Sequence, residues 1–378
     1  MVMRAIERGS GRLRVGLAWL WRPALLFVSS RVLVLLALVV AGAARRGLGL
    51  RASMTRWDGG FYLGIAKYGY PSTVHGPSRL AFFPGFPLAI RAVESMLRLS
   101  VFRASVVVVF AFGLAAACGV WLLTRDLANP EAADRATALF VFAPGSFVLS
   151  MAYSEAMFVF CAVATCWALI HKRWILAGVI GAVGAATRPD GLALVLAAAC
   201  AAYVEYRDGH RLRPIVAVAV VASGFVTVQA YFWAHTKDLF AFFDTERQGW
   251  HHGFSTLGTG RIDDIRSVWH TILHGGRPDW NHLVPLVGLV VFVGAFVALA
   301  RWKPPVPLIG YTVGMAYFAF TSVSVGFRPR LLMATFPLSM ALGAILRRGP
   351  WFATVLAASS ALLVMLTIVT ATTRYLVP

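Results

Sequence analysis

The sequence predicts an all-α integral membrane protein that crosses the bilayer many times. Of its 378 residues, 59% are hydrophobic and 13% are charged, and the mean hydropathy is +0.72. A water-soluble core of this size does not require so apolar a composition, so lipid is the expected solvent. Because backbone polar groups in a bilayer need internal partners, separate apolar runs of this kind are expected to be helices.

Eleven apolar runs approach or reach the length of a membrane span, which is about 17 to 25 residues. They lie near residues 24–44, 105–123, 136–151, 154–170, 174–187, 190–206, 214–234, 283–300, 305–325, 331–346 and 351–371. The first run lacks a small-residue cleavage signature, so we expect a retained helix and no signal peptide. The two runs that flank Arg188 are also compatible with half-helices that meet at membrane depth. No repeat divides the sequence, which favours a single membrane domain over residues 1–378.

Two segments, 45–104 and 235–282, are too polar and too rich in Gly, Pro and aromatic residues to span. Counting helices from a cytoplasmic N-terminus puts both on the outer face of the membrane. The short connections left inside are rich in Lys and Arg, as the positive-inside rule requires. We therefore expect the chemistry of the protein in these two outer loops, with 45–104 as the first, catalytic one.

The charge and cysteine patterns exclude other classes of partner and site. The formal net charge is +19, but the basic residues fall between apolar runs and not in one patch. This distribution indicates contact with membrane lipids and their anionic headgroups, and it argues against nucleic acid. The four cysteines, Cys118, Cys161, Cys166 and Cys200, lie inside apolar runs without CxxC or CxxH spacing. We predict neither a disulfide framework nor a thiolate metal site.

The segment that follows the first span contains a candidate catalytic carboxylate. Apolar and aromatic residues at positions 57, 61, 62, 65 and 68 recur at helical spacing, which predicts an amphipathic helix at the membrane interface. Asp58 stands at its start, where the helix dipole favours a negative charge. The spacing alone leaves open a purely structural role for Asp58 as an N-cap.

The stretch Ala81–Leu88, AFFPGFPL, is too rich in proline for a continuous helix and too apolar for a free loop. It must therefore pack against another part of the chain. Together with Asp58 and the aromatic residues Trp57 and Tyr62, it outlines a pocket at the membrane surface. Such a pocket suits the polar head of a lipid-linked substrate.

The run WDGGFYLGIAKYGYP followed by AFFPGFPL resembles the opening signature of the PIG-V-like mannosyltransferases, which are glycosyltransferases of the C fold (GT-C). The further stretches that fit are Tyr153–Glu155, Thr187–Gly191, Ala241–Trp250 and Phe327–Pro337. The resemblance extends from about residue 50 to about residue 345. It implies a GT-C bundle of about eleven transmembrane helices, with amphipathic interfacial helices in the first outer loop.

Members of this family are expected to take mannose from polyprenyl-phosphate mannose on the outer side of the membrane and pass it to a hydroxyl. The resemblance thus implies an inverting mannosyltransferase of the plasma (inner) membrane with a lipid-anchored acceptor, a glycolipid or a lipoglycan. A hydroxyl needs a base to accept its proton, and Asp58 is the candidate. Arg188, Arg328 and Arg330 are the candidates for binding the donor phosphate. The alternative role of each arginine is that of an anchor at the interface.

Four further residues are expected to contact substrate alongside Trp57 and Tyr62. Glu155 opens a predicted span, where it either binds an acceptor hydroxyl or pairs with one of the arginines. Gln248, Trp250 and His251 are assigned to the acceptor side, although a position in the aromatic belt is the commoner role for a tryptophan.

No metal or other cofactor is expected. The pairs His251–His252 and Asp263–Asp264 do not have the spacing of a metal site, because ligands on a regular helix usually stand three or four residues apart.

Three alternatives stay open at the level of the sequence. In the first, the enzyme uses another polyprenyl-phosphate sugar, such as arabinose, as its donor. In the second, the protein is a lipid flippase or transporter without catalysis. In the third, it is a structural membrane subunit. A transporter concentrates its essential charges near the bilayer midplane. The polar residues of this chain gather instead in the predicted outer loops, which favours the enzyme.

Overall fold

The computed structural model describes residues 19–45, 49–73, 77–209, 212–250, 259–277, 279–322 and 326–373. These residues form helices and no β-strand, which confirms the all-α prediction. The α-helices are α2 (Trp21–Ala44), α3 (Leu50–Met54), α4 (Asp58–Tyr68), α5 (Gly85–Leu97), α6 (Val101–Leu127), α7 (Pro130–Val141), α8 (Glu155–Ile170), α9 (Trp174–Ala185), α10 (Leu192–Gly209), α11 (Ile215–Thr236), α12 (Ala241–Trp250), α13 (Thr259–Leu273), α14 (Trp280–Trp302), α15 (Val306–Thr321), α16 (Pro329–Ala334), α17 (Pro337–Ile345) and α18 (Pro350–Thr372). Short 3-10 helices are η1 (Arg79–Ala81), η2 (Pro144–Ser150) and η3 (Pro189–Gly191).

Within these ranges, five helices are long and apolar enough to cross a membrane: α2, α6, α11, α14 and α18. A sixth span results if α7 and η2, which are bent by 77° relative to each other, are counted together. The predicted count of eleven spans is not confirmed. Several predicted runs correspond to shorter apolar helices, namely α8 and α15 with 16 residues each and α9 with 12. The protein is a multi-pass membrane protein built partly from helices shorter than a full span.

The predicted span at 136–151 is a broken helix, and a buried arginine binds the backbone at the break. Arg31 of α2 is 1% exposed and donates hydrogen bonds to the carbonyl oxygens of Val141 (2.9 Å) and Ser146 (2.5 Å). Pro144 lies between these two residues and has no N–H to continue the helix. The predicted span at 331–346 is likewise divided, with Pro337 in the first turn of its second half, α17.

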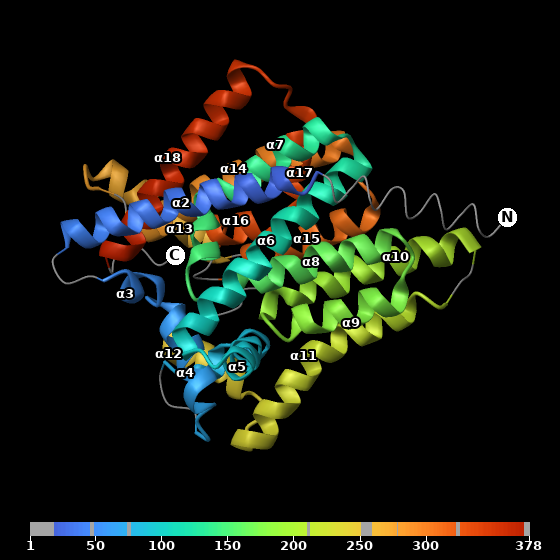
Figure 1. Ribbon diagram of the computed structural model, residues 1–378, viewed down its shortest axis with the longest axis horizontal. Coiled ribbons are helices and arrows are strands. Elements are labelled where there is room, and N and C mark those ends of the chain that lie inside the picture. Colours follow the sequence, from blue (N-terminus) through green and yellow to red (C-terminus); the bar gives the residue numbers. More distant parts are fainter. Residues whose placement is uncertain are drawn as a thin grey trace.

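Several long helices begin where the sequence provides a cap. The side chains of Ser100, Asn129 and Asp279 accept backbone N–H groups at the starts of α6, α7 and α14. In space, α8, α9, α10 and α11 form one group, and α2, α7, α14, α17 and α18 lie on the other side of the molecule (Figure 1). Helix α6 packs against both α8 and α7 and so connects the two groups.

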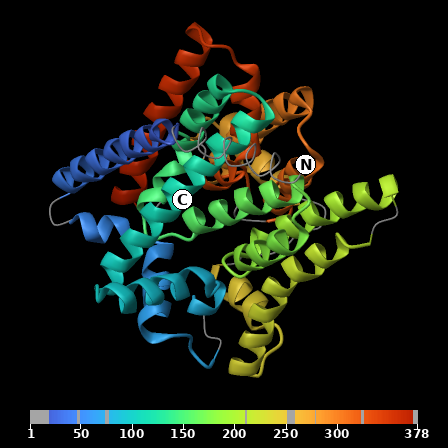
Figure 2. The same ribbon diagram turned by 45° about the vertical axis from the view of Figure 1, so that its right-hand side comes forward.

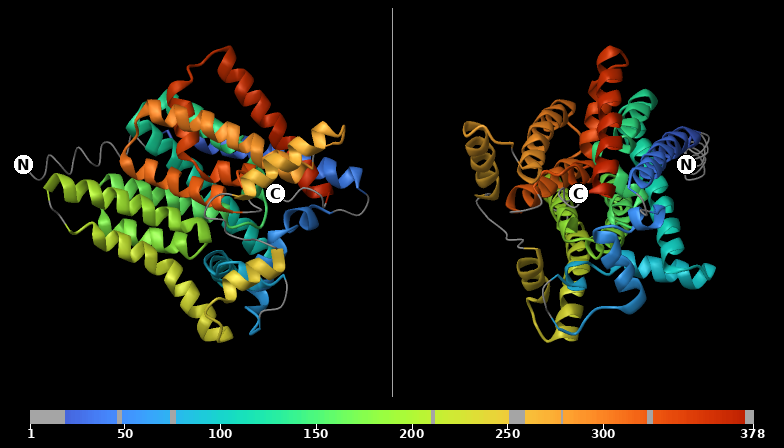
Figure 3. Two further views of the ribbon diagram at one scale, coloured as in Figure 1. Left: turned by 180° about the vertical axis from the view of Figure 1, so that it is seen from behind. Right: turned by 90° about the vertical axis from the view of Figure 1, so that its left-hand side faces the viewer.

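The two predicted outer segments pack against each other at one end of the molecule. The short helices α3, α4, α5 and α12 gather there, as seen from two sides in Figures 2 and 3. The Ala81–Leu88 stretch forms the break between η1 and α5, as its prolines predicted. Its Phe82 stacks on Phe61 of α4 with ring centroids 4.8 Å apart, and its Phe83 contacts Phe242 of α12 at 5.2 Å. This packing places the predicted catalytic helix in a fixed aromatic setting.

Candidate active site

Asp58 is the first residue of α4, and the backbone just before it is strained. Trp57 occupies the N-cap position with φ 58° and ψ −124°, a conformation that residues other than glycine rarely adopt. The indole Nε1 of Trp57 donates a hydrogen bond to the carbonyl oxygen of Thr370 in α18 (3.2 Å). No side chain caps this helix start, so the structure does not support the N-cap role for Asp58.

Arg330 of α16 bridges two carboxylates. Its Nη1 lies 2.5 Å from Asp58 Oδ2 and 3.7 Å from Glu155 Oε1. Burial disfavours its charge, but Asp58 and Glu155 outweigh this effect and raise the pKa of Arg330 above its usual value. The side chain therefore stays a cation at every physiological pH. The close approach that brings Arg330 here depends on Gly145, whose missing Cβ would lie 2.1 Å from the carbonyl oxygen of Pro329.

Glu155 and Arg188 form the second ion pair of the site. Glu155 opens α8 and is 1% exposed, and its Oε1 lies 2.6 Å from Arg188 Nη1. The contact is close, but neither carboxylate oxygen of Glu155 makes a hydrogen bond of good geometry. On its other side, Arg188 donates from Nε to Asp190 Oδ1 (2.9 Å). Burial opposes the charge of Arg188, yet Asp190 and Glu155 together raise its pKa well above the usual value.

Hydroxyl groups form hydrogen bonds between α4 and the residues that precede α8. The Tyr62 hydroxyl and Ser154 Oγ share a hydrogen bond of 2.7 Å, and Arg188 Nη1 donates to Ser154 Oγ at 3.4 Å. The Tyr153 hydroxyl donates to the carbonyl oxygen of Arg56 (3.3 Å), just before Asp58. Burial raises the pKa of Tyr62, so its phenol remains protonated.

Asp58, Glu155, Arg188, Asp190 and Arg330 thus form one charged network drawn from four separate stretches of the chain. We call these five residues the charged network. Four of its members are residues predicted from the sequence, and the contact of Asp190 with Arg188 was not predicted. The order Arg-Pro-Asp could have indicated this contact, because Asp190 stands two residues after Arg188 within the motif Thr187–Gly191.

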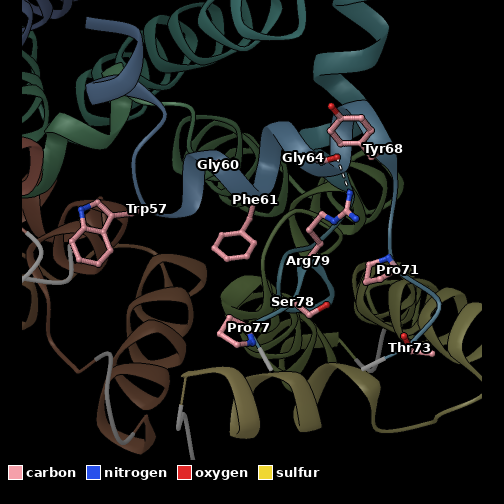
Figure 4. Close-up of a pocket in the computed structure, with 10 residues that line it drawn as sticks. All are labelled: Trp57, Gly60, Phe61, Gly64, Tyr68, Pro71, Thr73, Pro77, Ser78 and Arg79. Atoms are coloured by element: carbon pink, nitrogen blue, oxygen red, sulfur yellow. Dashed lines mark hydrogen bonds between the residues drawn. The ribbon is translucent and has the colours of Figure 1, made fainter. Parts of the chain in front are cut away.

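A groove of about 650 Å³ runs along α4 (Figure 4). Its lining residues are Trp57, Gly60, Phe61, Gly64, Tyr68, Pro71, Thr73, Pro77, Ser78 and Arg79. Arg79 donates from Nη1 to the carbonyl oxygen of Gly64 (3.2 Å). The groove therefore combines aromatic walls with a cation, within one residue of Asp58 along the chain. Of the residues that outlined the predicted pocket, Trp57 lines this groove, whereas Asp58, Tyr62 and the Ala81–Leu88 stretch do not.

Arg328 belongs to a different cluster. It is 5% exposed, and burial together with the nearby cations Arg330 and Arg261 lowers its pKa to about 10. Asp264 in the same cluster receives Nη1 of Arg261 at 2.9 Å and Nδ1 of His282 at 2.7 Å. The structure thus does not bring Arg328 into contact with Asp58.

The remaining candidates lie outside the charged network or outside the described residues. Gln248 is exposed on α12. The side chain of Trp250, and the whole of His251 and His252, lie outside the described part of the chain. Among the described residues, no three His, Cys, Asp or Glu side chains gather closely enough to hold a metal ion.

Comparison with solved structures finds similar helix arrangements at low identity. The archaeal oligosaccharyltransferase AglB from Archaeoglobus fulgidus, solved in complex with an inhibitory peptide and a dolichol-phosphate, has a TM-score of 0.48 and 12% identity. The similarity covers 91% of this chain and 56% of that one. A crystal structure of the oligosaccharyltransferase from the same organism, in complex with Zn and sulfate, has a TM-score of 0.46 at 12% identity and covers 90% and 53% of the two chains. No residue role or activity is transferred from these structures.

Curated relatives match a shorter part of the sequence at higher identity. GPI alpha-1,6-mannosyltransferase 2 from Cricetulus griseus is 32% identical over 157 residues, which are 39% of this chain and 31% of that protein. The Rattus norvegicus protein of the same name is 33% identical over 156 residues, with the same coverage of 39% and 31%. The alignments therefore span about a third of the length of these relatives.

A family model covers more than half of the chain. Residues 24–240 match the model described as Mannosyltransferase (PIG-V). This region contains Asp58, Glu155, Arg188 and the whole of the groove, whereas Arg330 lies beyond it. The match agrees with the resemblance seen in the run that begins at Trp57. The chain belongs to the PIG-V family of mannosyltransferases.

Proposed function

We propose that this protein is an inverting mannosyltransferase that moves mannose from polyprenyl-phosphate mannose to a hydroxyl of a membrane glycolipid or lipoglycan. Family membership supports the sugar and the reaction class. The observation that carries the proposal is the position of Asp58, which is 24% exposed, is paired with Arg330, and follows Trp57 of the aromatic groove in the sequence. A reachable carboxylate and a permanent cation are the two groups that such a transfer requires.

In the proposed reaction, the acceptor hydroxyl attacks C1 of the mannose, and Asp58 takes the proton of that hydroxyl. A new bond forms between C1 and the acceptor oxygen. The bond between C1 and the phosphate oxygen of the donor breaks, and its electron pair stays on the phosphate. Because attack comes from the face opposite the leaving group, a β-linked mannose becomes an α-mannoside.

Arg330 is the candidate for the group that binds the donor phosphate. It remains charged, and its side chain, which is 13% exposed, is held beside Asp58, so its guanidinium is the cation next to the proposed base. Arg188 is already held between Glu155 and Asp190, and this arrangement favours a role in positioning Glu155. Arg328 lies in the neighbouring cluster and contributes positive charge near Arg330.

The donor and acceptor of this proposal are lipids, which suits a site on short helices at one end of the spans. We assign this end to the outer face of the plasma membrane, because the short connections at the other end are basic. The mechanism proposed here uses no metal and no cofactor.

The test is mannose transfer from radiolabelled polyprenyl-phosphate mannose into membrane glycolipid. It compares the wild-type protein, Asp58→Asn and the control Asp208→Asn at matched expression. Asp208 is an exposed carboxylate near the end of α10. We expect Asp58→Asn to lower kcat by about 10²- to 10⁴-fold and Asp208→Asn to leave it unchanged. Undiminished transfer by Asp58→Asn contradicts the role of Asp58 as base. If the wild type transfers arabinose from its polyprenyl phosphate and no mannose, the donor assignment is wrong.

A further inference from the structure

A second groove, of about 720 Å³, lies between the N-terminal halves of α2 and α18 and the start of α7. The two long helices meet near their C-terminal ends, where Arg45 donates a hydrogen bond to the carbonyl oxygen of Thr372. They diverge toward their N-terminal ends (Figures 1 and 2). Because the C-terminal end of α2 leads through α3 to Asp58, this groove lies at the opposite end of α2, a helix of 24 residues.

The rim of the groove carries charges of both signs with a positive balance. Its charged residues are Arg22, Glu131, Asp134, Arg135 and Arg348, three cations and two anions. Asp134 Oδ2 lies 2.9 Å from Arg22 Nη1 and 3.7 Å from Arg348 Nη2. Each guanidinium has five N–H donors, so this contact leaves most of them available. The side chain of Arg348 is 70% exposed.

The wall below the rim is apolar. It is formed by Leu25, Leu26, Ala138, Phe352, Ala353 and Leu356. Three tryptophans next to the rim are exposed, Trp19 by 36%, Trp21 by 61% and Trp351 by 80%. Exposed tryptophans at the ends of spans mark the boundary between membrane and water. The arginines therefore lie at the level of lipid headgroups, and the apolar wall lies at the level of acyl chains.

We propose that this groove binds a phospholipid of net charge −1, with its phosphodiester at Arg22 and Arg348 and an acyl chain along α2 and α18. The net charge of +1 on the rim matches one phosphodiester, and basic pockets between spans suit anionic headgroups. A small water-soluble anion is a poorer fit, because it would contact the arginines and leave the apolar wall of the groove uncovered. A zwitterionic lipid brings its ammonium group next to the same arginines. The proposal does not depend on the chemistry proposed for Asp58.

The test uses the purified full chain in an uncharged detergent, titrated with dioleoyl phosphatidylglycerol and followed by native mass spectrometry. The variants are Arg348→Gln and Arg22→Gln/Arg348→Gln. The matched control is Arg91→Gln/Arg103→Gln, which removes two exposed arginines of α5 and α6 outside the groove. With about a fivefold contribution from each basic residue, affinity falls about fivefold in the single variant and about 25-fold in the double variant. The control keeps the wild-type affinity.

Circular dichroism and the unfolding temperature without added lipid show whether each variant is folded. The Arg348 side chain is largely exposed, so we expect Arg348→Gln to fold. If the double variant unfolds, this single variant still tests the proposal. Equal affinity of the wild type and the folded variants overturns the proposal. Binding of glycerol 3-phosphate as tight as that of the lipid overturns it in favour of a soluble anion. Equally tight binding of dioleoylglycerol shows that the arginines do not recognise the ligand.

Discussion

Arg330 Nη1 lies 2.5 Å from the Asp58 carboxylate, although the two residues are 272 positions apart in the sequence. The proposed base and the proposed phosphate-binding residue are therefore paired with each other. In the proposed mechanism, a donor phosphate competes with Asp58 for Arg330, because both are oxygen anions that accept from the same guanidinium. The proposal is that donor binding separates the pair and leaves Asp58 available to accept the proton of the acceptor hydroxyl.

Replacing Arg330 tests this exchange. Arg330→Gln removes the charge that stabilises the departing phosphate, and we expect kcat to fall by about 10²- to 10³-fold. Arg330→Lys keeps the charge but loses the planar fork of donors, so its kcat lies between those of the wild type and Arg330→Gln. The control is Arg301→Gln, at an exposed position near the end of α14. A wild-type kcat in Arg330→Gln contradicts the assignment of the phosphate to this residue.

Gly145 offers a test of how Arg330 is positioned. A Cβ at this site meets the Pro329 carbonyl oxygen at 2.1 Å and the Arg330 backbone nitrogen at 2.5 Å, and backbone atoms cannot rotate away as a side chain does. We expect Gly145→Ala to cost about 1–3 kcal/mol in the free energy of unfolding, as overpacking does. Transfer falls as well, because Arg330 is displaced from Asp58.

The matched control for this prediction is Gly294→Ala in α14, where nothing lies within 4 Å of the added Cβ. Alanine replaces glycine in a helix there and stabilises it by about 0.5–1 kcal/mol. Thermal unfolding and mannose transfer are measured for both variants. If the two variants behave alike, the contact between Gly145 and Pro329 does not position Arg330.

The sequence predicted where the long helices lie better than it predicted where a helix is broken. Apolar composition located the long helices α2, α6, α11, α14 and α18, since each run is close to a full span. It could not show the break between α7 and η2. At that break Arg31, which comes from another helix, binds the carbonyl oxygens of Val141 and Ser146. Pro144 was the local signal, but a proline alone does not distinguish a kink from an end of a helix.

The part of the candidate site that lies within one short stretch of sequence, the start of α4, could be predicted. The aromatic helix with Asp58 at its start could be inferred from helical spacing alone. The proximity of Glu155, Arg188 and Arg330 to Asp58 could not, because it arises from the packing of elements distant in sequence. These residues were candidates because of the resemblance to a family. The tertiary contacts show that Arg330 belongs to the charged network and that Arg328 does not.

Phe61 tests whether the groove holds substrate. Its ring stacks on Phe82 and lines the groove one helical turn after Trp57. We expect Phe61→Ala to raise KM for one lipid substrate about tenfold, since an aromatic contact contributes about 0.5–1.5 kcal/mol beyond its buried area. The change in kcat is smaller, because Asp58 and Arg330 stay in place. The control Phe240→Ala removes a phenylalanine that is 59% exposed and outside the groove. An unchanged KM for both donor and acceptor contradicts a substrate role for the groove.

The pair of Glu155 and Arg188 predicts strong energetic coupling inside the charged network. Arg188→Gln leaves the almost fully buried carboxylate of Glu155 without its closest cation, and breaking a buried pair in this way costs about 3–5 kcal/mol. Glu155→Gln removes the carboxylate instead and leaves Arg188 paired with Asp190. In Glu155→Gln/Arg188→Gln the Glu155 carboxylate is no longer left without a cation, although Asp190 still loses Arg188. The double variant therefore loses less stability than the sum of the single losses.

The double-mutant cycle is measured by unfolding in detergent micelles, and the exposed pair of Asp244 and Arg247 is its control. Their contact of 2.8 Å is almost as short as that of Glu155 and Arg188, but the Arg247 side chain is 73% exposed. Water screens such a pair, so we expect its coupling to stay below about 1 kcal/mol. Additive losses at Glu155 and Arg188 contradict the prediction. Strong coupling between Glu155 and Arg188, with weak coupling between Asp244 and Arg247, shows that the burial of an ion pair, and not its distance, determines how strongly it stabilises the charged network.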